Sequence, residues 1–162
     1  MAIIYICSEF LPLSMQMWEY DKKKIFLASD HAGFELKQAI RKFLIKKGKK
    51  IMDLGTRNVN SVDYPDFAHL LARKMKKDKD NFGILVCGSG IGMDMAANKH
   101  KNIRAALCYN VRSAKLSRKH NNANVMTVGS RLTKKSVALK CVKEFLNTKF
   151  EGGRHLKRVK KI

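Results

Sequence analysis

Short apolar segments alternate along this chain with stretches that have the spacing of an amphipathic helix. The apolar segments are 25–29, 50–55, 83–88, 103–109 and 123–129. In the stretch after the first one, Leu36, Ile40 and Leu44 recur at helical spacing, and Gly48 then marks a stop. Strands that alternate with helices form a parallel sheet covered on both faces. The sequence therefore predicts an α/β fold, a three-layer α/β/α sandwich with a five-stranded parallel sheet and Rossmann-like layering.

The chain divides into a short N-terminal segment and one domain. Its 162 residues and 45% hydrophobic content suit a single globular domain. Residues 1–21 contain no Lys or Arg, which a secretory signal or a transit peptide would need. We therefore expect 1–21 to be an extension outside a domain that covers 22–162, rather than an added peripheral strand or an anchor on a membrane surface. No run of about 18 apolar residues could span a bilayer, so we expect no membrane partner.

The formal net charge of +21 is high for a chain of this length. Such a field attracts polyanions and speeds the capture of anionic substrates, so nucleic-acid binding has to be considered. The lysines are spread along the chain and often fall on the polar face of a predicted helix, and no nucleic-acid-binding motif is present. We interpret the charge as a solvated surface and expect no specific nucleic-acid partner.

The cysteines give no sign of a metal site or of a disulfide framework. They are Cys7, Cys87, Cys108 and Cys141. They form no CxxC pair and have no histidine at zinc-ligand spacing. Unpaired cysteines suit a reducing compartment, so we expect a cytoplasmic protein without a bound metal.

Polar residues follow two of the predicted strands and the helix after a third. In an open parallel sheet, ligands bind beyond the carboxyl ends of the strands. Asp30 and His31 follow the first strand, and the run CGSGIG (87–92) follows the strand at 83–88. His120 and Asn121 lie on the helix after the segment 103–109. These side chains are candidates for a functional site.

The glycine-rich turn at 87–92 exposes backbone N–H groups near the start of a helix, which suits an oxyanion or a phosphate. Its GxGxG spacing is not the dinucleotide fingerprint GxGxxG, and no Gly-Lys-Ser/Thr follows as in a Walker A loop. Cys87 stands at the mouth of this turn, where a helix N-terminus and a cationic protein favour the thiolate. A thiolate there can act as a nucleophile or a base, whereas an arbitrary cysteine is more often a small buried core residue.

Four basic side chains have both a functional and a structural interpretation. His31 and His120 can be surface or helix-end histidines, although Asp30 could orient the neighbouring His31 ring or bind a hydroxyl. Arg154 and Arg158 are four residues apart, so on a helical turn their guanidinium groups face one way and suit a phosphate monoester. The alternative for these arginines is a basic C-terminal tail.

Several motifs together resemble one family. They are SDHAGFELK (29–37), DLGT (53–56), DYPDFA (63–68), CGSGIGMDMAANK (87–99), IRAALC (103–108), SRKHNNANV (117–125), GSR (129–131) and FEGGRHLKRV (150–159). In this order, from about residue 23 to about residue 159, they are similar to the ribose-5-phosphate isomerase B family, which also includes the galactose-6-phosphate isomerase subunits. Only residues 1–21 lie outside the resemblance.

The resemblance implies a domain that forms a homodimer or a tetramer, with active sites built from both subunits. It implies an aldose–ketose isomerase of the pentose phosphate pathway that interconverts ribose 5-phosphate and ribulose 5-phosphate through an enediolate, without a cofactor or metal. The implied catalytic residues are Cys87, which moves a proton between C1 and C2, Ser89, which assists, and His120, which helps to open the ring. The implied substrate-binding residues are Asp30, His31, Tyr64, Gly88, Gly90, Ile91, Gly92, Asn121, Arg131, Arg154 and Arg158.

One position divides the family, because some members lack the cysteine and carry a glutamate base just after the glycine turn. That position is Met93 here, and Asp94 is turned from it by about 100° on a helix. Since Cys87 is present, the chain resembles the cysteine type. The alternatives are an isomerase of a six-carbon sugar phosphate such as allose or galactose 6-phosphate, a basic nucleic-acid-binding module, and a sugar-phosphate-binding regulator without activity.

Overall fold

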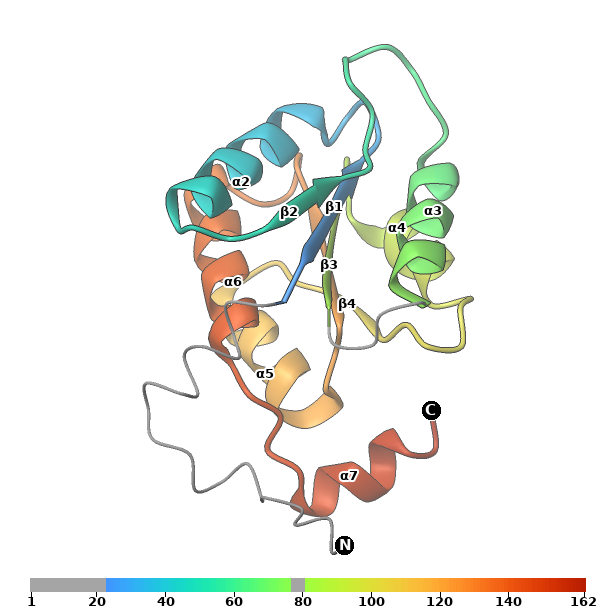
Figure 1. Ribbon diagram of the computed structural model, residues 1–162, viewed down its shortest axis with the longest axis vertical. Helices are drawn as coiled ribbons and strands as arrows, with labels where there is room; N and C mark the ends of the chain where they lie inside the picture. Colours follow the sequence, from blue (N-terminus) through green and yellow to red (C-terminus); the bar gives the residue numbers. More distant parts are fainter. Residues whose placement is uncertain (1–22, 77–80) are drawn as a thin grey trace, which may run out of the picture.

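The computed structural model describes residues 23–76 and 81–162, so the expected extension 1–21 lies outside the described residues. The described residues form a parallel sheet between two layers of helices (Figure 1). The strands are β1 (Ile25–Ser29), β2 (Ile51–Asp53), β3 (Phe82–Cys87), β4 (Ala105–Leu107) and β5 (Val125–Gly129). They are all parallel, in the order β2-β1-β3-β5-β4. The predicted α/β/α sandwich with a five-stranded parallel sheet is confirmed.

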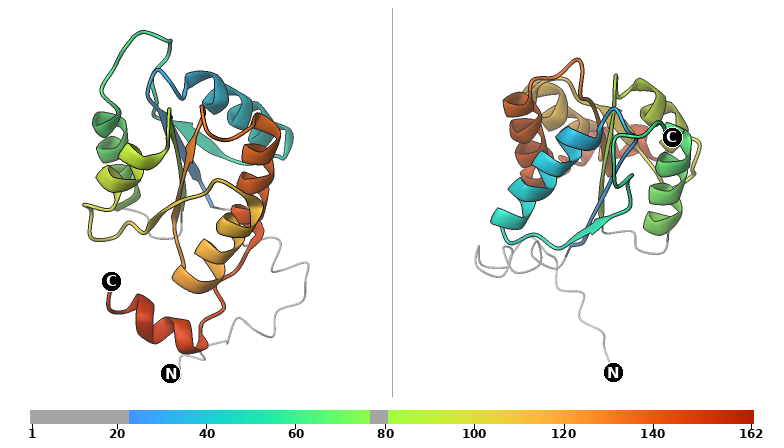
Figure 2. Two further views of the ribbon diagram at one scale, coloured as in Figure 1. Left: turned by 180° about the vertical axis from the view of Figure 1, so that it is seen from behind. Right: turned by 90° about the horizontal axis from the view of Figure 1, so that it is seen from above.

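Helices cover both faces of this sheet. They are α2 (Phe34–Lys46), α3 (Tyr64–Lys76), α4 (Ile91–Ala97), α5 (Val111–Asn121), α6 (Lys135–Asn147) and α7 (Gly153–Val159). Helices α2, α5 and α6 lie on one face, and α3 and α4 lie on the other, as the view from above shows (Figure 2). Among the described residues, no helix is long and apolar enough to cross a membrane.

Local sequence explains where several of these elements begin and end. Pro65 lies in the first turn of α3, where its missing N–H is not needed. Asn110 caps α5, because its side chain accepts a hydrogen bond from the Ser113 N–H and the Ser113 side chain bonds back to the cap. The edge strands β2 and β4 are shorter than the apolar segments 50–55 and 103–109 that predicted them, since each pairs with a neighbour on one side only.

Each face of the sheet carries its own apolar core. On one face, Ile40 and Leu44 of α2 and Phe145 of α6 pack against β1 and β3. On the other face, Leu71 of α3 and Met93 of α4 pack against the same strands. The three central strands are buried along their whole length, which fixes the positions of the residues that follow them.

Different segments of the chain lie at the carboxyl ends and at the amino ends of the strands. The carboxyl ends of β1 and β3 lead into α2 and into the glycine turn before α4. Helix α5 runs antiparallel to the strands, so its last residues and α7 lie where the strands begin, here called the amino-terminal edge of the sheet (Figures 1 and 2).

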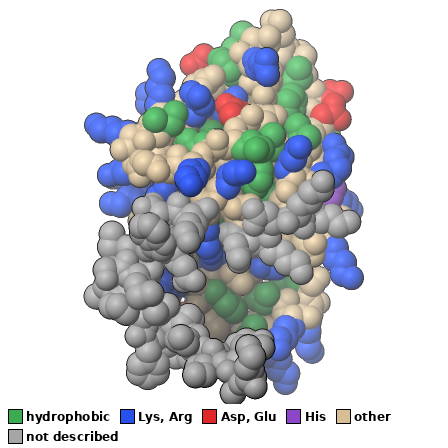
Figure 3. Space-filling view, viewed as in Figure 1, with side chains coloured by type: hydrophobic (Ala, Val, Ile, Leu, Met, Phe, Trp, Pro, Cys, Tyr) green, Lys and Arg blue, Asp and Glu red, His purple; other side chains and the backbone are tan. Residues whose placement is uncertain are grey.

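Lys and Arg side chains are scattered over the face that Figure 3 shows, with hydrophobic groups between them, and do not form one stripe.

Candidate active site

A cavity of about 600 Å³ lies at the carboxyl edge of the sheet. It brings together the following predicted residues: Asp30, His31, Tyr64, Cys87, Gly88, Ser89, Ile91, Gly92 and Arg131. Ala32, Met95 and Leu132 also line it and were not predicted. The signal that could have indicated Met95 is its position one helical turn after Ile91, on the same face of α4.

Cys87 is the last residue of β3 and is only 4% exposed. The Gly90 N–H donates to its Sγ at 3.1 Å, and an N–H pointing at sulfur stabilises negative charge there. The other described cysteines do not suit a reactive thiolate, because burial raises the pKa of Cys141 and raises that of Cys108 to about 12. Cys87 is therefore the described cysteine with the position and contacts of a reactive thiol.

The turn after Cys87 depends on glycine at position 90. Gly90 has φ of +83°, in the left-handed region, and a Cβ there would lie 2.6 Å from Leu107 Cδ1 and 2.9 Å from Gly129 N. The side chain of Ser89 accepts a hydrogen bond from the Ile91 N–H at 3.2 Å. In the glycine-rich turn, the Gly90 N–H thus points at the Cys87 sulfur and the Ile91 N–H at the Ser89 hydroxyl.

Asp30 and His31 follow β1 and face the same cavity. Asp30 is buried, and its Oδ1 accepts a hydrogen bond from the Gly33 N–H at 2.8 Å, which closes the turn into α2. The Val62 N–H donates to His31 Nδ1 at 3.1 Å, and the Val62 carbonyl oxygen lies 3.2 Å from the same nitrogen. The loop between β2 and α3 therefore sets the orientation of the His31 ring.

That loop is itself tied to the sheet by a buried ion pair. Lys37 Nζ lies 2.8 Å from both carboxylate oxygens of Asp53 and donates to the Thr56 carbonyl oxygen at 3.0 Å. The Thr56 N–H in turn donates to the Ser29 carbonyl oxygen at 3.0 Å. Sequence reasoning missed this tether, which holds the loop against the end of β1.

Two glycines make room for larger cavity residues. A Cβ at Gly92 would lie 2.6 Å from Cε2 and Cζ of Tyr64, so the phenol ring rests directly on the Gly92 backbone. A Cβ at Gly88 would lie 3.4 Å from Nε and Nη1 of Arg131, so the guanidinium group lies over the turn next to Cys87. The Arg131 N–H donates to the Gly88 carbonyl oxygen at 3.0 Å, which holds the two segments together.

Met93 stands at the position where some members of the resembled family carry a glutamate base. Met93 is fully buried in the core under α4. The Thr127 hydroxyl donates to Asp94 Oδ1 at 2.9 Å, and Asn98 Nδ2 donates to its Oδ2 at 3.3 Å. Burial raises the pKa of Asp94, while these two hydrogen bonds lower it. Asp94 is thus held by its neighbours and does not line the cavity.

Four predicted residues lie elsewhere in the chain. His120 and Asn121 end α5, and Arg154 and Arg158 lie on α7, so all four are at the amino-terminal edge of the sheet. Both arginines are exposed. A single chain therefore does not bring these four residues to the cavity that contains Cys87.

The comparisons with known proteins agree with this geometry. The sequence profile of a family described as Ribose/Galactose Isomerase matches residues 25–162. A probable ribose-5-phosphate isomerase B from Mycoplasma genitalium is 48% identical over 85% of this chain and 92% of its own length. Ribose-5-phosphate isomerase B from Escherichia coli is 41% identical over 86% of this chain and 94% of its own length.

Solved structures show the same similarity in three dimensions. The structure of ribose-5-phosphate isomerase B from Mycoplasma genitalium with bound ribulose-5-phosphate matches with a TM-score of 0.84 at 46% identity, over 86% of this chain and 93% of that one. The enzyme from Thermotoga maritima matches with a TM-score of 0.84, also at 46% identity, over 86% of this chain and 97% of that one. With a family profile that covers nearly the whole described domain, this chain belongs to the ribose/galactose isomerase family.

Proposed function

We propose that this chain interconverts ribose 5-phosphate and ribulose 5-phosphate, with Cys87 as the base that moves a proton between C1 and C2. The observation that carries the proposal is the cavity in which Cys87 Sγ, the glycine turn and the basic residues His31 and Arg131 meet. The structure from Mycoplasma genitalium with bound ribulose-5-phosphate supports the choice of substrate. The described cysteines Cys87, Cys108 and Cys141 are free, which suits the proposed location in the reducing cytoplasm.

The chemistry requires a positioned base and an electrostatic clamp on a developing oxyanion. The proton on C2 of a hydroxyaldehyde is weakly acidic, so its removal needs both. The Gly90 N–H donates a hydrogen bond to the Sγ of Cys87, which holds the proposed base in the cavity. Ser89 and the N–H groups between Gly88 and Gly92 that are not engaged by Cys87 and Ser89 would hold the enediolate oxygens. Asp30 and Tyr64 would contact sugar hydroxyls. Return of the proton to C1 and transfer of the hydroxyl proton from O2 to O1 complete the isomerisation. C1 is reduced as C2 is oxidised, so no external oxidant or reductant is needed.

Cys87 is favoured over a carboxylate as the base. The glutamate position is the buried Met93, and Asp94 is engaged by Thr127 and Asn98. Asp30 is the other carboxylate of the cavity, but its Oδ1 is used to close the turn at Gly33.

The phosphate and the anomeric hydroxyl would be bound by a second subunit. In one chain, His31 and Arg131 line the cavity, whereas His120, Arg154 and Arg158 lie at the far edge. We propose a homodimer in which each cavity receives these three residues, together with Asn121, from the partner. His120 would take the proton of the anomeric hydroxyl during ring opening, and the arginines would bind the phosphate.

The reaction is tested by measuring turnover of ribose 5-phosphate and ribulose 5-phosphate, with allose 6-phosphate as the six-carbon comparison. Cys87→Ala should lower turnover by about 10³-fold or more, at the upper part of the range for a general base. Cys87→Ser, which keeps the shape but not the acidity of the thiol, should be nearly as inactive. Substantial turnover by either folded variant would remove Cys87 from the role of base, and a preference for allose 6-phosphate would move the substrate to the six-carbon class.

The shared site is tested by mixing two inactive variants. When Cys87→Ala and His120→Ala subunits exchange freely, half of the dimers are mixed, and one of their two sites carries no substitution, so about a quarter of the wild-type activity should return. Cys87→Ala mixed with Arg131→Ala is the matched control, because both changes fall in the same half of the site and no intact site can form. If the first mixture recovered no activity, each site would be built within one chain.

A further inference from the structure

We propose that His120, Glu151 and His155 form a binding site for zinc or a similar divalent cation, and that zinc bound there inhibits the isomerase by holding His120. The site itself rests on the geometry of this chain alone. The inhibition rests in addition on the proposed role of His120 in ring opening.

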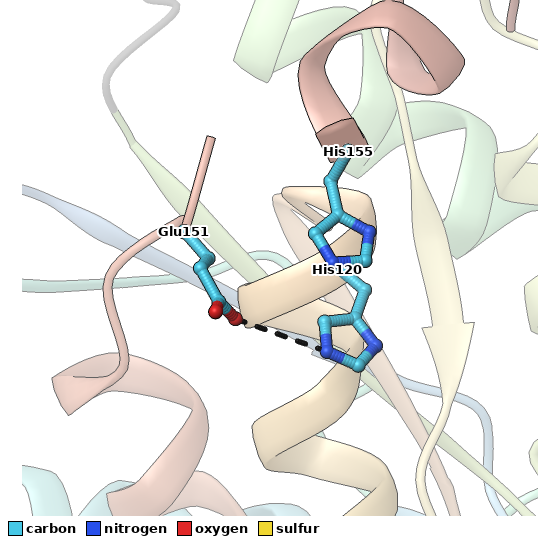
Figure 4. A group of neighbouring side chains, drawn as sticks. All are labelled: His120, Glu151 and His155. Atoms are coloured by element: carbon cyan, nitrogen blue, oxygen red, sulfur yellow. Dashed lines mark ion pairs between the residues drawn. The ribbon is translucent and has the colours of Figure 1, made fainter. Parts of the chain in front are cut away.

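The three side chains converge at the amino-terminal edge of the sheet (Figure 4). One ring nitrogen of each histidine and one carboxylate oxygen of Glu151 lie within 4.8 Å of one another. His120 Nε2 is 3.9 Å from Glu151 Oε2. Zinc bonds of about 2.0–2.2 Å place tetrahedral ligand atoms about 3.3 Å apart, so the three atoms need to approach by no more than about 1.5 Å.

Metal binding requires one histidine to turn out of a ring stack, and the exposed side chains of the site allow this. The rings of His120 and His155 are stacked, with centroids 4.2 Å apart and planes 8° from parallel. Two parallel rings cannot both direct a nitrogen lone pair at one ion, so the His120 ring must turn out of the stack for both to bind. The side chains of His120 and Glu151 are 37% and 50% exposed and can rotate. His155 is buried, so it would be the fixed ligand of the set.

The backbone already holds the two contributing segments together. The Glu151 N–H donates to the Lys119 carbonyl oxygen at 3.0 Å, next to His120 in the chain. Arg118 Nε donates to the Thr148 carbonyl oxygen at 3.2 Å, one residue earlier in α5 and three residues before Glu151. The end of α5 and the segment before α7 are therefore held next to each other without a metal. Little of the free energy of metal binding would be spent on ordering them.

The donor set selects the class of cation. Two imidazoles and one carboxylate suit zinc and its neighbours, whereas magnesium and calcium prefer oxygen ligands only. Three protein ligands leave a fourth position for water. We therefore expect zinc to bind and magnesium to be inert.

A metal at this site would compete with protons for the two imidazoles and with a nearby lysine for the carboxylate. The competing cation at the carboxylate is Lys119, whose Nζ lies 3.4 Å from Glu151 Oε2 in an exposed ion pair that contributes little.

Bound zinc would act on one step of the reaction. A histidine nitrogen that binds zinc cannot accept the proton of the anomeric hydroxyl, so ring opening should fail while Cys87 stays free. Zinc should thus inhibit conversion of cyclic ribose 5-phosphate more than exchange of the C1 proton of ribulose 5-phosphate, which is an open chain.

Zinc binding is measured by calorimetry on the full-length protein without a histidine tag, with magnesium as the inert ion. Glu151→Gln and His155→Gln should each weaken zinc binding by more than about 10-fold. Loss of a group that only hydrogen-bonds to a metal ligand already costs about that much, and loss of a ligand itself should cost more. Cys87→Ala and His69→Ala are the controls, because the Cys87 thiol and the pair His69–His100, with ring nitrogens 2.8 Å apart, are two other described places where zinc could bind. Unchanged binding in both ligand variants would overturn the site.

Inhibition is then measured on the same proteins. Zinc should inhibit the wild type reversibly, with recovery on EDTA, and the half-inhibitory concentration should rise more than about 10-fold in Glu151→Gln. Zinc that binds at this site by calorimetry but leaves ring opening intact would overturn the inhibitory role and the role of His120 together. Failure of the isomerase assay with every sugar phosphate would instead overturn the proposed function and leave the calorimetric result standing.

Discussion

Replacing Asp53 by alanine should destabilise the protein by about 3–5 kcal/mol, because the change leaves a buried ammonium group without its counter-ion. Lys37 Nζ lies 2.8 Å from both oxygens of Asp53, and its side chain is 2% exposed, against 24% for Asp53. In Asp53→Ala, water could not reach the unpaired Lys37 ammonium group. In a variant without Lys37, water could reach the unpaired Asp53 carboxylate in part. Lys37→Met should therefore destabilise the protein less than Asp53→Ala does.

Thermal unfolding at one fixed protein concentration measures this difference, since association would otherwise shift the midpoint. In a protein of this size 1 kcal/mol corresponds to about 2–4 °C, so Asp53→Ala should lower Tm by about 6–20 °C. The double variant Lys37→Met/Asp53→Ala leaves no charge buried and should lose less than the sum of the single changes. Lys115→Met is the control, because its Nζ lies 3.7 Å from Glu144 Oε1 in an exposed pair worth at most about 1 kcal/mol.

The same tether should affect substrate binding below the unfolding temperature. It holds the loop whose Val62 contacts the ring of His31 at the cavity. Lys37→Met should therefore raise KM for ribose 5-phosphate in protein that circular dichroism shows to be folded. An Asp53→Ala protein with a Tm within about 2 °C of the wild type, or a double variant as unstable as the sum, would refute the reasoning.

Three further changes test the site. Gly92→Ala places a Cβ 2.6 Å from the Tyr64 ring and should lower kcat/KM by up to about 100-fold through displacement of that ring, with Tm measured to confirm the fold. Turnover should persist in EDTA, because the described cavity residues form no group of three metal ligands, and loss of activity that a divalent metal restored would contradict the cofactor-free mechanism. Arg154→Ala and Arg158→Ala should each lower kcat/KM by about 10- to 150-fold, as expected for a charge-assisted contact, and the double variant by less than the product. Values near those of the wild type at high salt would reduce the arginines to a basic tail.

The carboxyl ends of two strands could be read from the sequence because they depend on local pattern. β1 and β3 are continuous apolar segments, and parallel strands that neighbour each other end at the same edge of the sheet. Asp30 and Cys87 therefore had to lie near each other once the strands were assigned. The family motifs then added Tyr64 and Arg131, whose place at the cavity depends on contacts with the backbone of Gly92 and Gly88 that no periodicity reveals.

Other features of the site depend on contacts between distant segments. The ion pair of Lys37 and Asp53 and the contact of Val62 with His31 join residues 16 and 31 positions apart, and each side chain alone looks like an ordinary surface residue. His120 follows a strand in sequence, but α5 carries it back along the sheet to the other edge. Its neighbours there, Glu151 and His155, belong to a segment that the sequence predicted only as a phosphate-binding or basic tail.

The charge of +21 acts in opposite directions on the two kinds of binding that the proposed function requires. It attracts a sugar phosphate dianion to the cavity, and it also makes two copies of the chain repel each other. In the proposed dimer, association would then depend on apolar contact, and Ile91, Met95 and Leu132, which line the cavity and are 45%, 66% and 69% exposed, would supply it. Each such side chain contributes about 1.5–3 kcal/mol when fully buried. Salt screens charges more than about 10 Å apart at 0.1 M, so it weakens the repulsion between subunits and the long-range attraction of substrate together. In the proposed dimer, the exposed apolar residues that line the cavity would therefore be as necessary as the basic residues that enter it from the partner.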